Sequence, residues 1–524
     1  MSPPLAGLND AAAGGFEPPD PTIAAGPGFV VEVANLAARV WRTGAGTGPQ
    51  LLLTESLSTI FRAGDERLTD PRLLYDASSG RWFASISDED RNSVLLAVSR
   101  TPDPTGTWSV YSYLSSGCAD QPRLGLSDAV VVLGADVFAD CNGGFSPAIG
   151  AELWIVSKQD LVAGVASPAF SSYGPDRAFS SFSPVQSLSS TSTEYVVSVD
   201  DPSSRVVHLF SVDGVPPAPV HVQAVAALPL PPLQRPPQGL QPVAGGFGRV
   251  PGIATNDDRV LDAVWENGKL WFSANSGCVP AGDSALRSCA RITELTTATP
   301  AVDWSTDLGQ QNASLYFPAL RPDVAGNLVV VYGESSAGLA PQLVVQARTV
   351  DGTFTAPVIV AQGSGPVLGG RYGDYFGAAR DPSNPSTIWV AGETGTDVAG
   401  GRGWSTALAS VVVNGAPSAP PAVSASPPPR LRALASRGRQ GAAVKLAFDV
   451  LDEGTGVRVQ VVVSRSTSVV FHTTTSAATL HAQHSYTVNW RPAKSLHGSL
   501  RFCVRSVATD GTRSAQSCAA LTLR

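Results

Sequence analysis

The stretch GDYFGAARDPSNPSTIWVAGE, residues 373–393, contains the pattern that decides the fold. Polar residues lead into a short run of small and apolar residues, which turns into a bulkier run rich in Val and aromatic side chains. Each such copy predicts two antiparallel strands, and turn signals such as Asn267-Gly268 fall between the runs. Six further copies of the pattern start at Asp20, Asp70, Asp120, Phe182, Asp257 and Tyr316.

The spacing of the copies indicates the architecture. Successive copies start about 50–75 residues apart, and further strand candidates, such as 94–99 and 108–113, lie between them. About four strands per repeat at this period is typical of a β-propeller, so seven copies predict seven blades over residues 1–415. Small residues such as Ala24, Ala25 and Ala378 suit inner strands that crowd round a channel. A doubled β-sandwich array would need more strands per repeat.

The two ends of the chain complete this prediction of an all-β protein. Residues 416–429 are rich in Pro, Ala and Ser and predict a linker. Alternating apolar residues in 430–524 predict an immunoglobulin- or fibronectin-like β-sandwich. The seventh blade lacks a strand before the linker, so residues before Asp20 are expected to supply it. The Pro-rich segment 212–256 is expected to be a long loop that overhangs the channel mouth.

Composition excludes several classes of partner. The net charge is -7, the pI is about 5.4 and no basic stripe is visible, so we expect no nucleic-acid partner. No run of 18 apolar residues predicts a membrane span. Met1 is followed by polar, Pro-rich sequence, so we expect no signal peptide within this sequence. We expect a monomer.

The six cysteines indicate the compartment. They show no CxxC spacing, and too few histidines accompany them for a zinc site. Six buried free thiols are the alternative to three local disulfides, which are more typical of secreted chains. We therefore predict an extracellular protein with the pairs Cys118–Cys141, Cys278–Cys289 and Cys503–Cys518.

The candidate site follows from the propeller prediction, because the starts of the inner strands should converge on one funnel. Paired carboxylates there could hydrolyse a glycosidic bond. Arginines could clamp a uronate, with a tyrosine as the base for elimination. Asp20 and Asp374 could hold Ca²⁺, which is the one cofactor we consider. The residues expected around this funnel are Asp20, Asp70, Arg72, Asp120, Arg123, Asp258, Arg259, Tyr316, Arg371, Asp374 and Tyr375.

A purely structural role for the Asp and Arg residues is an alternative to these three functions. An Asp before Pro often caps a turn, and an Arg two or three positions later can pair with an Asp of the next blade. The better candidates for ligand binding are therefore the residues that break the repeat. Arg371 and Asp374 would hold a hydroxyl-rich or anionic ligand, while Tyr316 and Tyr375 would stack on a sugar ring. Gly373 would permit close approach of the backbone.

These segments resemble a family. DPTIAAGPGFVVEVAN (20–35), DPRLLYD (70–76), AVSRTPDPTGTW (97–108) and RYGDYFGAARDP (371–382) are similar to secreted bacterial seven-bladed β-propeller proteins. These are mostly uncharacterised, are often followed by an immunoglobulin-like module, and are in part loosely called sialidase-like. The resemblance covers nearly the whole chain and implies architecture. The Asp-box S-x-D-x-G-x-T-W and the Arg-Ile-Pro segment of sialidases are absent from the sequence.

Two functions follow as expectations. The first is a secreted propeller that binds a polysaccharide or a cell-surface glycan through its funnel. The alternative is a sialidase-like glycoside hydrolase or a polysaccharide lyase that acts in the same funnel. GxSxG, HExxH and P-loop motifs are absent from the sequence, so other hydrolytic chemistries receive no support.

Overall fold

The computed structural model describes residues 1–44, 47–141, 146–199, 205–242, 252–396, 403–413, 429–452, 454–466, 468–476, 478–507 and 513–524. The chain divides into two compact units, Met1–Pro421 and Ala422–Arg524. Apart from Pro429, the predicted linker lies outside the described residues. The regular structure is almost entirely β, and the helices in the described ranges are the short α1 (Leu57–Ile60) and α2 (Lys158–Ala163).

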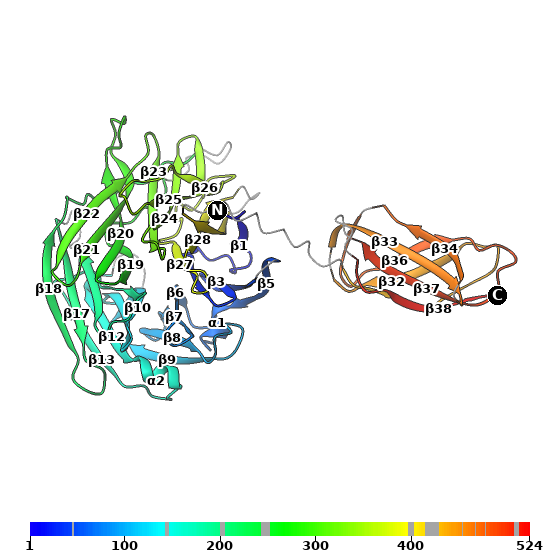
Figure 1. Cartoon of the computed structure of the whole chain (residues 1–524), viewed down its shortest axis with the longest axis horizontal. Coiled ribbons are helices and arrows are strands. Elements are labelled where there is room, and N and C mark those ends of the chain that lie inside the picture. Colours follow the sequence, from blue (N-terminus) through cyan, green and yellow to red (C-terminus); the bar gives the residue numbers. More distant parts are fainter. Residues whose placement is uncertain are drawn as a thin grey trace. The chain divides into compact units, whose positions relative to one another are not determined.

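The first unit consists of antiparallel sets of four strands, and first strands such as β6, β10, β19 and β27 lie nearest a common centre (Figure 1). Set 1 is β2 (Thr22–Gly26), β3 (Phe29–Ala34), β4 (Ala37–Gly44) and β5 (Thr47–Ser56). Set 2 is β6 (Leu68–Asp76), β7 (Arg81–Asp88), β8 (Ser93–Ser99) and β9 (Trp108–Leu114). Set 3 is β10 (Cys118–Leu126), β11 (Val130–Phe138), β12 (Ala148–Ser157) and β13 (Phe170–Asp176).

The remaining sets follow in chain order. Set 4 is β14 (Ser183–Pro184), β16 (Glu194–Val199), β17 (Val206–Asp213) and β18 (His221–Pro229). Set 5 is β19 (Val260–Glu266), β20 (Lys269–Cys278), β21 (Arg287–Thr296) and β22 (Ala301–Leu308). Set 6 is β23 (Ser314–Pro322), β24 (Leu328–Ser336), β25 (Leu339–Arg348) and β26 (Val358–Ala361). Set 7 is β27 (Gly377–Arg380), β28 (Thr387–Gly395), β29 (Trp404–Val412) and β1 (Leu5–Asn9).

Set 7 is completed by the N-terminus, as the sequence predicts. β1 pairs antiparallel with β29, and Leu5 lies opposite Leu408. The first and last strands of the unit therefore share one sheet. Apolar clusters fill the spaces between neighbouring sets; one of them packs Val31 of set 1 against Leu73 and Trp82 of set 2. Such close-packed cores hold each set to the next.

An additional short strand links two of the sets. β15 (Gln186–Ser187) lies between β10 and β19 and pairs parallel with both. Gln186 is opposite Leu126 on one side and Val264 on the other. The link turns sets 3 and 5 into one nine-stranded sheet and places residues 186–190 close to the centre of the unit.

The Pro-rich segment is more ordered than the sequence suggests. Residues 221–229 are the outer strand β18 rather than loop. Farther on, Gly239 and Ile253 form a β-bridge, the Gln241 side chain bonds both the N–H and the C=O of Val367, and Leu233 is fully buried. The described parts of 230–255 thus pack as a strap over sets 5 to 7, which corrects the prediction of a loop; residues 243–251 lie outside the described ranges.

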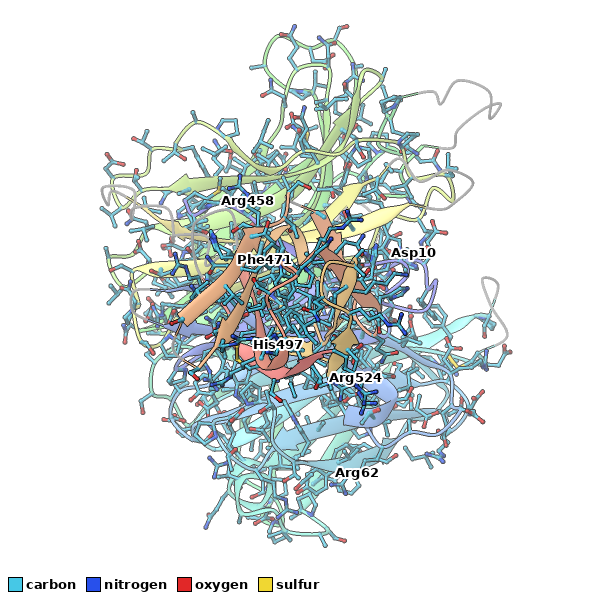
Figure 2. All side chains as sticks on the ribbon, turned by 90° about the vertical axis from the view of Figure 1, so that its right-hand side faces the viewer. Asp10, Arg62, Arg458, Phe471, His497 and Arg524 are labelled. Carbon is cyan, nitrogen blue, oxygen red and sulfur yellow. A yellow bond between two sulfur atoms is a disulfide. The ribbon has the colours of Figure 1, made fainter. Side chains whose placement is uncertain are left out.

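The second unit has two sheets that share one apolar core, which includes Phe448, Val461 and Phe502. One sheet is β30 (Leu431–Ala433), β32 (Val444–Val450) and β36 (Ser485–Trp490). The other is β31 (Ser436–Gly438), β38 (Ser517–Leu523), β37 (Gly498–Val507), β33 (Gly454–Arg465) and β34 (Ser468–Thr474), with β35 (Ala478–Leu480) paired to β33. Val457 and Val459 face the core, and Arg458 between them faces outward, as alternation on a strand requires (Figure 2).

The structure contains the three disulfides that the cysteine spacing predicts. Cys118–Cys141 and Cys278–Cys289 lie in the first unit, and Cys503–Cys518 joins β37 to β38 in the second. Among the described residues, no helix has the length and apolar character needed to cross a membrane.

Candidate functional site

The starts of the inner strands share an unusual backbone conformation. Asp20, Asp70, Gln121 and Phe317 each precede a proline and have φ of 47°, 60°, 46° and 55°. A positive φ is uncommon for residues other than glycine, and the α region is disfavoured before proline. Hydrogen bonds from other parts of the unit must therefore hold these residues in place. In set 7 the left-handed residue is Gly373, with φ of 100°.

A ring of hydrogen bonds supplies that support. The Asp70 N–H donates to Asn35 Oδ1 at 2.9 Å, and the Gln121 N–H donates to Asp70 Oδ2 at 3.0 Å. The Asp374 N–H donates to Asp20 Oδ1 at 2.6 Å, and Asn35 Nδ2 donates to Asp20 Oδ2 at 2.9 Å. We call Asp20, Asn35, Asp70, Gln121 and Asp374 the starting ring. It connects sets 1, 2, 3 and 7.

Asp374 is the most heavily bonded member of the starting ring. Its carboxylate accepts from Arg371 Nη2 at 2.8 and 3.0 Å, from Gln121 Nε2 at 3.1 Å and from Asn256 Nδ2 at 2.7 Å. Asp374 is buried, whereas the Arg371 side chain is 48% exposed. The residues that break the repeat in RYGDY therefore link set 7 to sets 3 and 5.

Two predicted acids near the ring favour their neutral form. Burial raises the pKa of Asp20 well above its usual value, and the neighbouring Asp374 and Asp70 add to the effect. Burial also raises the pKa of Asp120, assisted by Asp70 and Asp136. Asp120 lines a cavity of about 280 Å³ beside the Cys118–Cys141 disulfide. Asp258 is fully buried.

The predicted arginines mostly form ion pairs inside the unit. Arg123 pairs with Asp136 of its own set at 2.9 Å. Arg259 of set 5 pairs with the same Asp136 and, at 2.8 Å, with Asp257. The two arginines are thus engaged in ion pairs, but these lie within one set or between sets 3 and 5, rather than with an Asp of the next set, which the purely structural role predicts. Arg72 differs, because its guanidinium lies over the Tyr375 ring, with Cζ 3.3 Å from the ring centroid.

The two tyrosines proposed to stack on a sugar are inaccessible, which corrects the prediction. Tyr316 is fully buried, packs edge-on against Tyr372 and lies under Gly239 of the strap. Tyr375 is 1% exposed, and its hydroxyl donates to the Pro71 carbonyl at 3.0 Å. Burial raises the pKa of both phenols. Neither residue can therefore present a ring face to a ligand or act as the base of a lyase.

The calcium expectation is also corrected. Asp20 and Asp374 accept hydrogen bonds from N–H donors on all of their carboxylate oxygens, and such donors repel a cation. The described residues contain no group of three or more acidic, His or Cys side chains placed to hold a metal ion.

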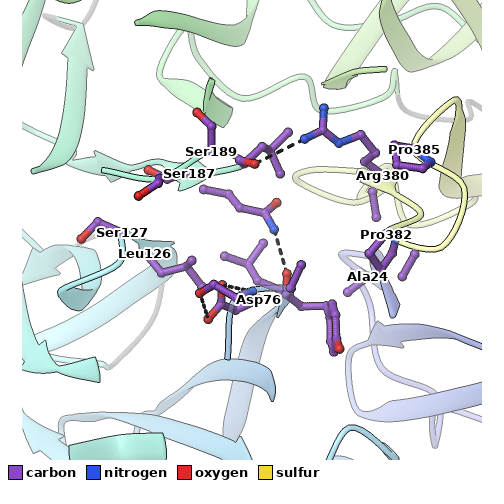
Figure 3. Close-up of a pocket in the computed structure, with 18 of the residues that line it drawn as sticks. Ala24, Asp76, Leu126, Ser127, Ser187, Ser189, Arg380, Pro382 and Pro385 are labelled. Carbon is purple, nitrogen blue, oxygen red and sulfur yellow. Dashed lines mark hydrogen bonds between the residues drawn. The ribbon is translucent and has the colours of Figure 1, made fainter. Parts of the chain in front are cut away.

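A cavity of the first unit lies at the opposite ends of the same inner strands (Figure 3). This outer cavity has a volume of about 460 Å³, within the range of roughly 300–1,000 Å³ typical of small-molecule sites. It is lined near the ends of β2, β6, β10 and β27 and by 186–190. The starting ring and the outer cavity thus lie at opposite ends of the inner strands.

Gln186 lies at the inner limit of the outer cavity. Its Nε2 donates to the Tyr75 carbonyl at 3.1 Å, and its Oε1 accepts from Arg321 Nε at 3.2 Å. The side chain thereby connects sets 2 and 6. Ser187 and Ser189 follow on the same segment (Figure 3). Ser187 Oγ is buried and has no hydrogen-bond partner among the described residues.

The charged groups of the outer cavity are neutralised by partners. Lys158 Nζ lies 2.7 Å from Asp76 Oδ2 and also donates to the Ser127 carbonyl. Burial opposes ionisation of Asp76, but Lys158 and nearby hydroxyls outweigh it, so the pKa of Asp76 is lowered. Arg380 pairs with Glu266 at 2.7 Å. The outer cavity is therefore polar without a strong excess of either charge.

Sequence reasoning missed this site for a definable reason. Its lining combines serines, a glutamine and apolar residues with charged residues such as Asp76, Lys158 and Arg380, and no catalytic motif brings these together in the sequence. One signal was present in FSPVQSLSS (182–190), where a polar run replaces the apolar run that follows the strand start in other copies. That polar run is β15 and the residues that line the cavity after it.

Comparisons with known proteins give a fold likeness alone. No protein-family model matches the chain, and no curated sequence matches it significantly. A protein of unknown function from Dyadobacter fermentans superposes with a TM-score of 0.39 and 11% identity over 75% of this chain and 94% of its own. A Hadza microbial sialidase superposes with a TM-score of 0.36 and 9% identity over 74% of this chain and 73% of its own. The phage phi92 endosialidase superposes with a TM-score of 0.38 and 9% identity over 76% of this chain and 67% of its own. At these scores the likeness transfers neither an activity nor site residues.

Proposed function

We propose that the first unit is a seven-bladed β-propeller that binds a saccharide in the outer cavity, and that the second unit is an immunoglobulin-like spacer. The four-stranded sets 1 to 7 would be the blades. The three disulfides are compatible with a secreted protein, and a polysaccharide or cell-surface glycan would be its partner.

The lining of the outer cavity carries the proposal. Saccharides present hydroxyls that both donate and accept, together with apolar ring faces. The cavity offers the accessible hydroxyls of Ser78, Ser189 and Ser190 beside apolar surface from Leu188 and Val324. Binding sites of this kind combine an apolar wall with a few well-placed polar groups. Lys158 and Arg380 are already paired with carboxylates and Asp128 adds a negative charge, so the cavity favours a neutral sugar over a uronate.

Binding receives more support than hydrolysis at this location. A glycosidase needs a carboxylic acid whose pKa is raised and a second carboxylate across the bond. The acids of this lining are Asp76 and Asp128. Asp76 is held ionised by Lys158, and Asp128 accepts a hydrogen bond from the Ser190 hydroxyl. The lining residues therefore supply no proton donor of the required kind.

A hydrolase at the other end is the second candidate. Asp120 and Glu89 line the cavity of about 280 Å³ near the starting ring, and burial raises the pKa of both. A glycoside hydrolase needs one protonated and one ionised carboxyl group; Asp120 would be the acid, and Glu89, which pairs with Arg67 at 3.0 Å, would be the carboxylate.

A panel of neutral and uronic oligosaccharides tests both functions. Retention on immobilised protein and release of new reducing ends would be measured on the same samples. We expect retention of neutral saccharides without new reducing ends. Turnover that disappears in Asp120→Asn would overturn binding as the function and establish the second candidate. Absence of retention across the panel would overturn the saccharide assignment.

A further inference from the structure

A second, smaller cavity lies midway along the inner strands of the first unit. Its volume is about 40 Å³, and it is lined by central residues of these strands, among them Arg72, Arg123 and Arg321. Leu74 lines both this inner cavity and the outer cavity. Gln186, which bonds Arg321, stands between them. The inner cavity therefore lies beyond the proposed saccharide site.

The guanidinium of Arg72 has N–H groups that find no hydrogen-bond acceptor at the inner cavity. Its Nε and Nη2 atoms are buried and have no hydrogen-bond partner among the described residues. The Tyr375 ring covers one face of the guanidinium, but the N–H groups point outward in the guanidinium plane and gain nothing from that contact. Burial lowers the pKa of Arg72, as expected for a cation that lacks a counter-charge. Unpaired charged donors in a protein interior are costly.

The neighbouring arginines, in contrast, have carboxylate partners. Arg321 Nη1 lies 2.6 Å from Asp262 Oδ2, and Arg123 Nη1 lies 2.9 Å from Asp136 Oδ1. Asp136 also pairs with Arg259, which in turn pairs with Asp257. Arg123, Arg259 and Arg321 thus each have a carboxylate partner, whereas no ion pair joins Arg72 to a carboxylate among the described residues.

We propose that the inner cavity binds one small monovalent anion, chloride under ordinary conditions, through the in-plane N–H groups of Arg72. The cavity is far smaller than the roughly 300–1,000 Å³ of small-molecule sites, so it suits a small ion. A single negative charge would pair with the Arg72 guanidinium. The surrounding Leu73, Leu124 and Leu261 lower the local dielectric and strengthen the interaction.

Such an anion would act as a structural ion at the centre of the unit. It would accept from Arg72 of set 2, so the free energy of unfolding would rise with the logarithm of the free halide concentration above Kd. This role is independent of the proposed saccharide binding.

Crystals of the full chain grown in bromide test the proposal directly. We expect an anomalous peak within hydrogen-bond distance of Arg72 Nε and Nη2. A peak absent from the inner cavity, with only a water refined there, would overturn it.

Thermal unfolding gives an independent readout with the same protein. At constant ionic strength, replacing gluconate, which is too large for the cavity, by chloride or bromide should raise the Tm by on the order of 1–2 °C per tenfold increase above Kd. Arg72→Met should abolish the halide dependence, while Arg67→Met, at an exposed position, should retain it. Equal Tm values in halide and gluconate would contradict the proposal, as would a larger rise in formate, which would assign the cavity to carboxylates. The comparison of wild-type Tm values in halide and in gluconate tests anion binding even if Arg72→Met does not fold.

Discussion

The Asp374 N–H donates to Asp20 Oδ1 at 2.6 Å, across 354 positions of the chain. This bond joins the last inner strand of the first unit to the first one. β1 joins the same two ends at the outer edge of set 7 through its pairing with β29. The unit is thus closed both near its centre and at its rim, which explains why polar residues gather in the RYGDY segment.

Replacement of Asp374 should therefore affect stability. Asp374→Ala removes the acceptor for Gln121, Asn256 and Arg371 and leaves buried amide donors unpaired, so we expect the free energy of unfolding of the first unit to fall by about 1–3 kcal/mol. Urea unfolding measures this difference. Arg371→Ala, which removes only a partly exposed partner, should cost less than about 1 kcal/mol. Equal costs for the two variants would contradict the structural role of the starting ring.

Glu32 should make stability depend on pH. Its carboxylate accepts from the Leu8 N–H of β1, and burial raises its pKa to about 7, although that N–H and the Thr406 hydroxyl favour the ionised form. Between about pH 4.5 and 7 the folded state keeps a proton that the unfolded chain has lost. The free energy of unfolding should therefore fall as pH rises through this window, by about 3 kcal/mol from this group.

The variant Glu32→Gln isolates that contribution. Gln keeps an acceptor for Leu8 but does not titrate, so about 3 kcal/mol of the decline between pH 4.5 and 7.5 should disappear. Asp65→Asn, at an exposed site, is the control and should leave the decline unchanged. The prediction fails if wild type and Glu32→Gln show parallel pH profiles in denaturant titrations.

The disulfides should stabilise the two units separately. Cys278 and Cys289 are 11 positions apart, and in the chain-entropy model their bond contributes about 3 kcal/mol to the first unit. Changing both residues to Ser should lower the unfolding transition of that unit. Changing Cys503 and Cys518 to Ser should instead lower the transition of the second unit. Calorimetry resolves the two transitions, and a shift of both by either double variant would argue against independent units.

The repeat made much of the fold predictable. Seven copies of one two-strand pattern predict the four-stranded sets, and the missing strand before residue 416 predicts the pairing of β1. Nothing in the pattern revealed the strap, because 230–242 is rich in proline and its order comes from contacts such as Gln241 with Val367. Likewise, β15 is only two residues long and depends on partners in two other sets.

The candidate site was less predictable, since sequence places residues near each other without showing whether their polar atoms are already bonded. Asp374 and Arg371 do come together, as expected, but they bond each other and the ring. Tyr316 was predicted to contact a ligand because it interrupts the repeat. In the structure it packs against Tyr372 under the strap instead. The outer cavity depends on serines whose common neighbourhood arises only from the fold.

Isothermal titration with the neutral saccharide retained in the panel measures whether the ligand binds in the outer cavity. Ala77→Trp places a large side chain at an exposed lining position, so it should weaken binding at least tenfold. Val350→Trp, also exposed but outside that lining, and Arg371→Ala, in contact with the starting ring, should bind like wild type. Undiminished binding by Ala77→Trp together with loss of binding in Arg371→Ala would contradict the account and return the site to the starts of the inner strands.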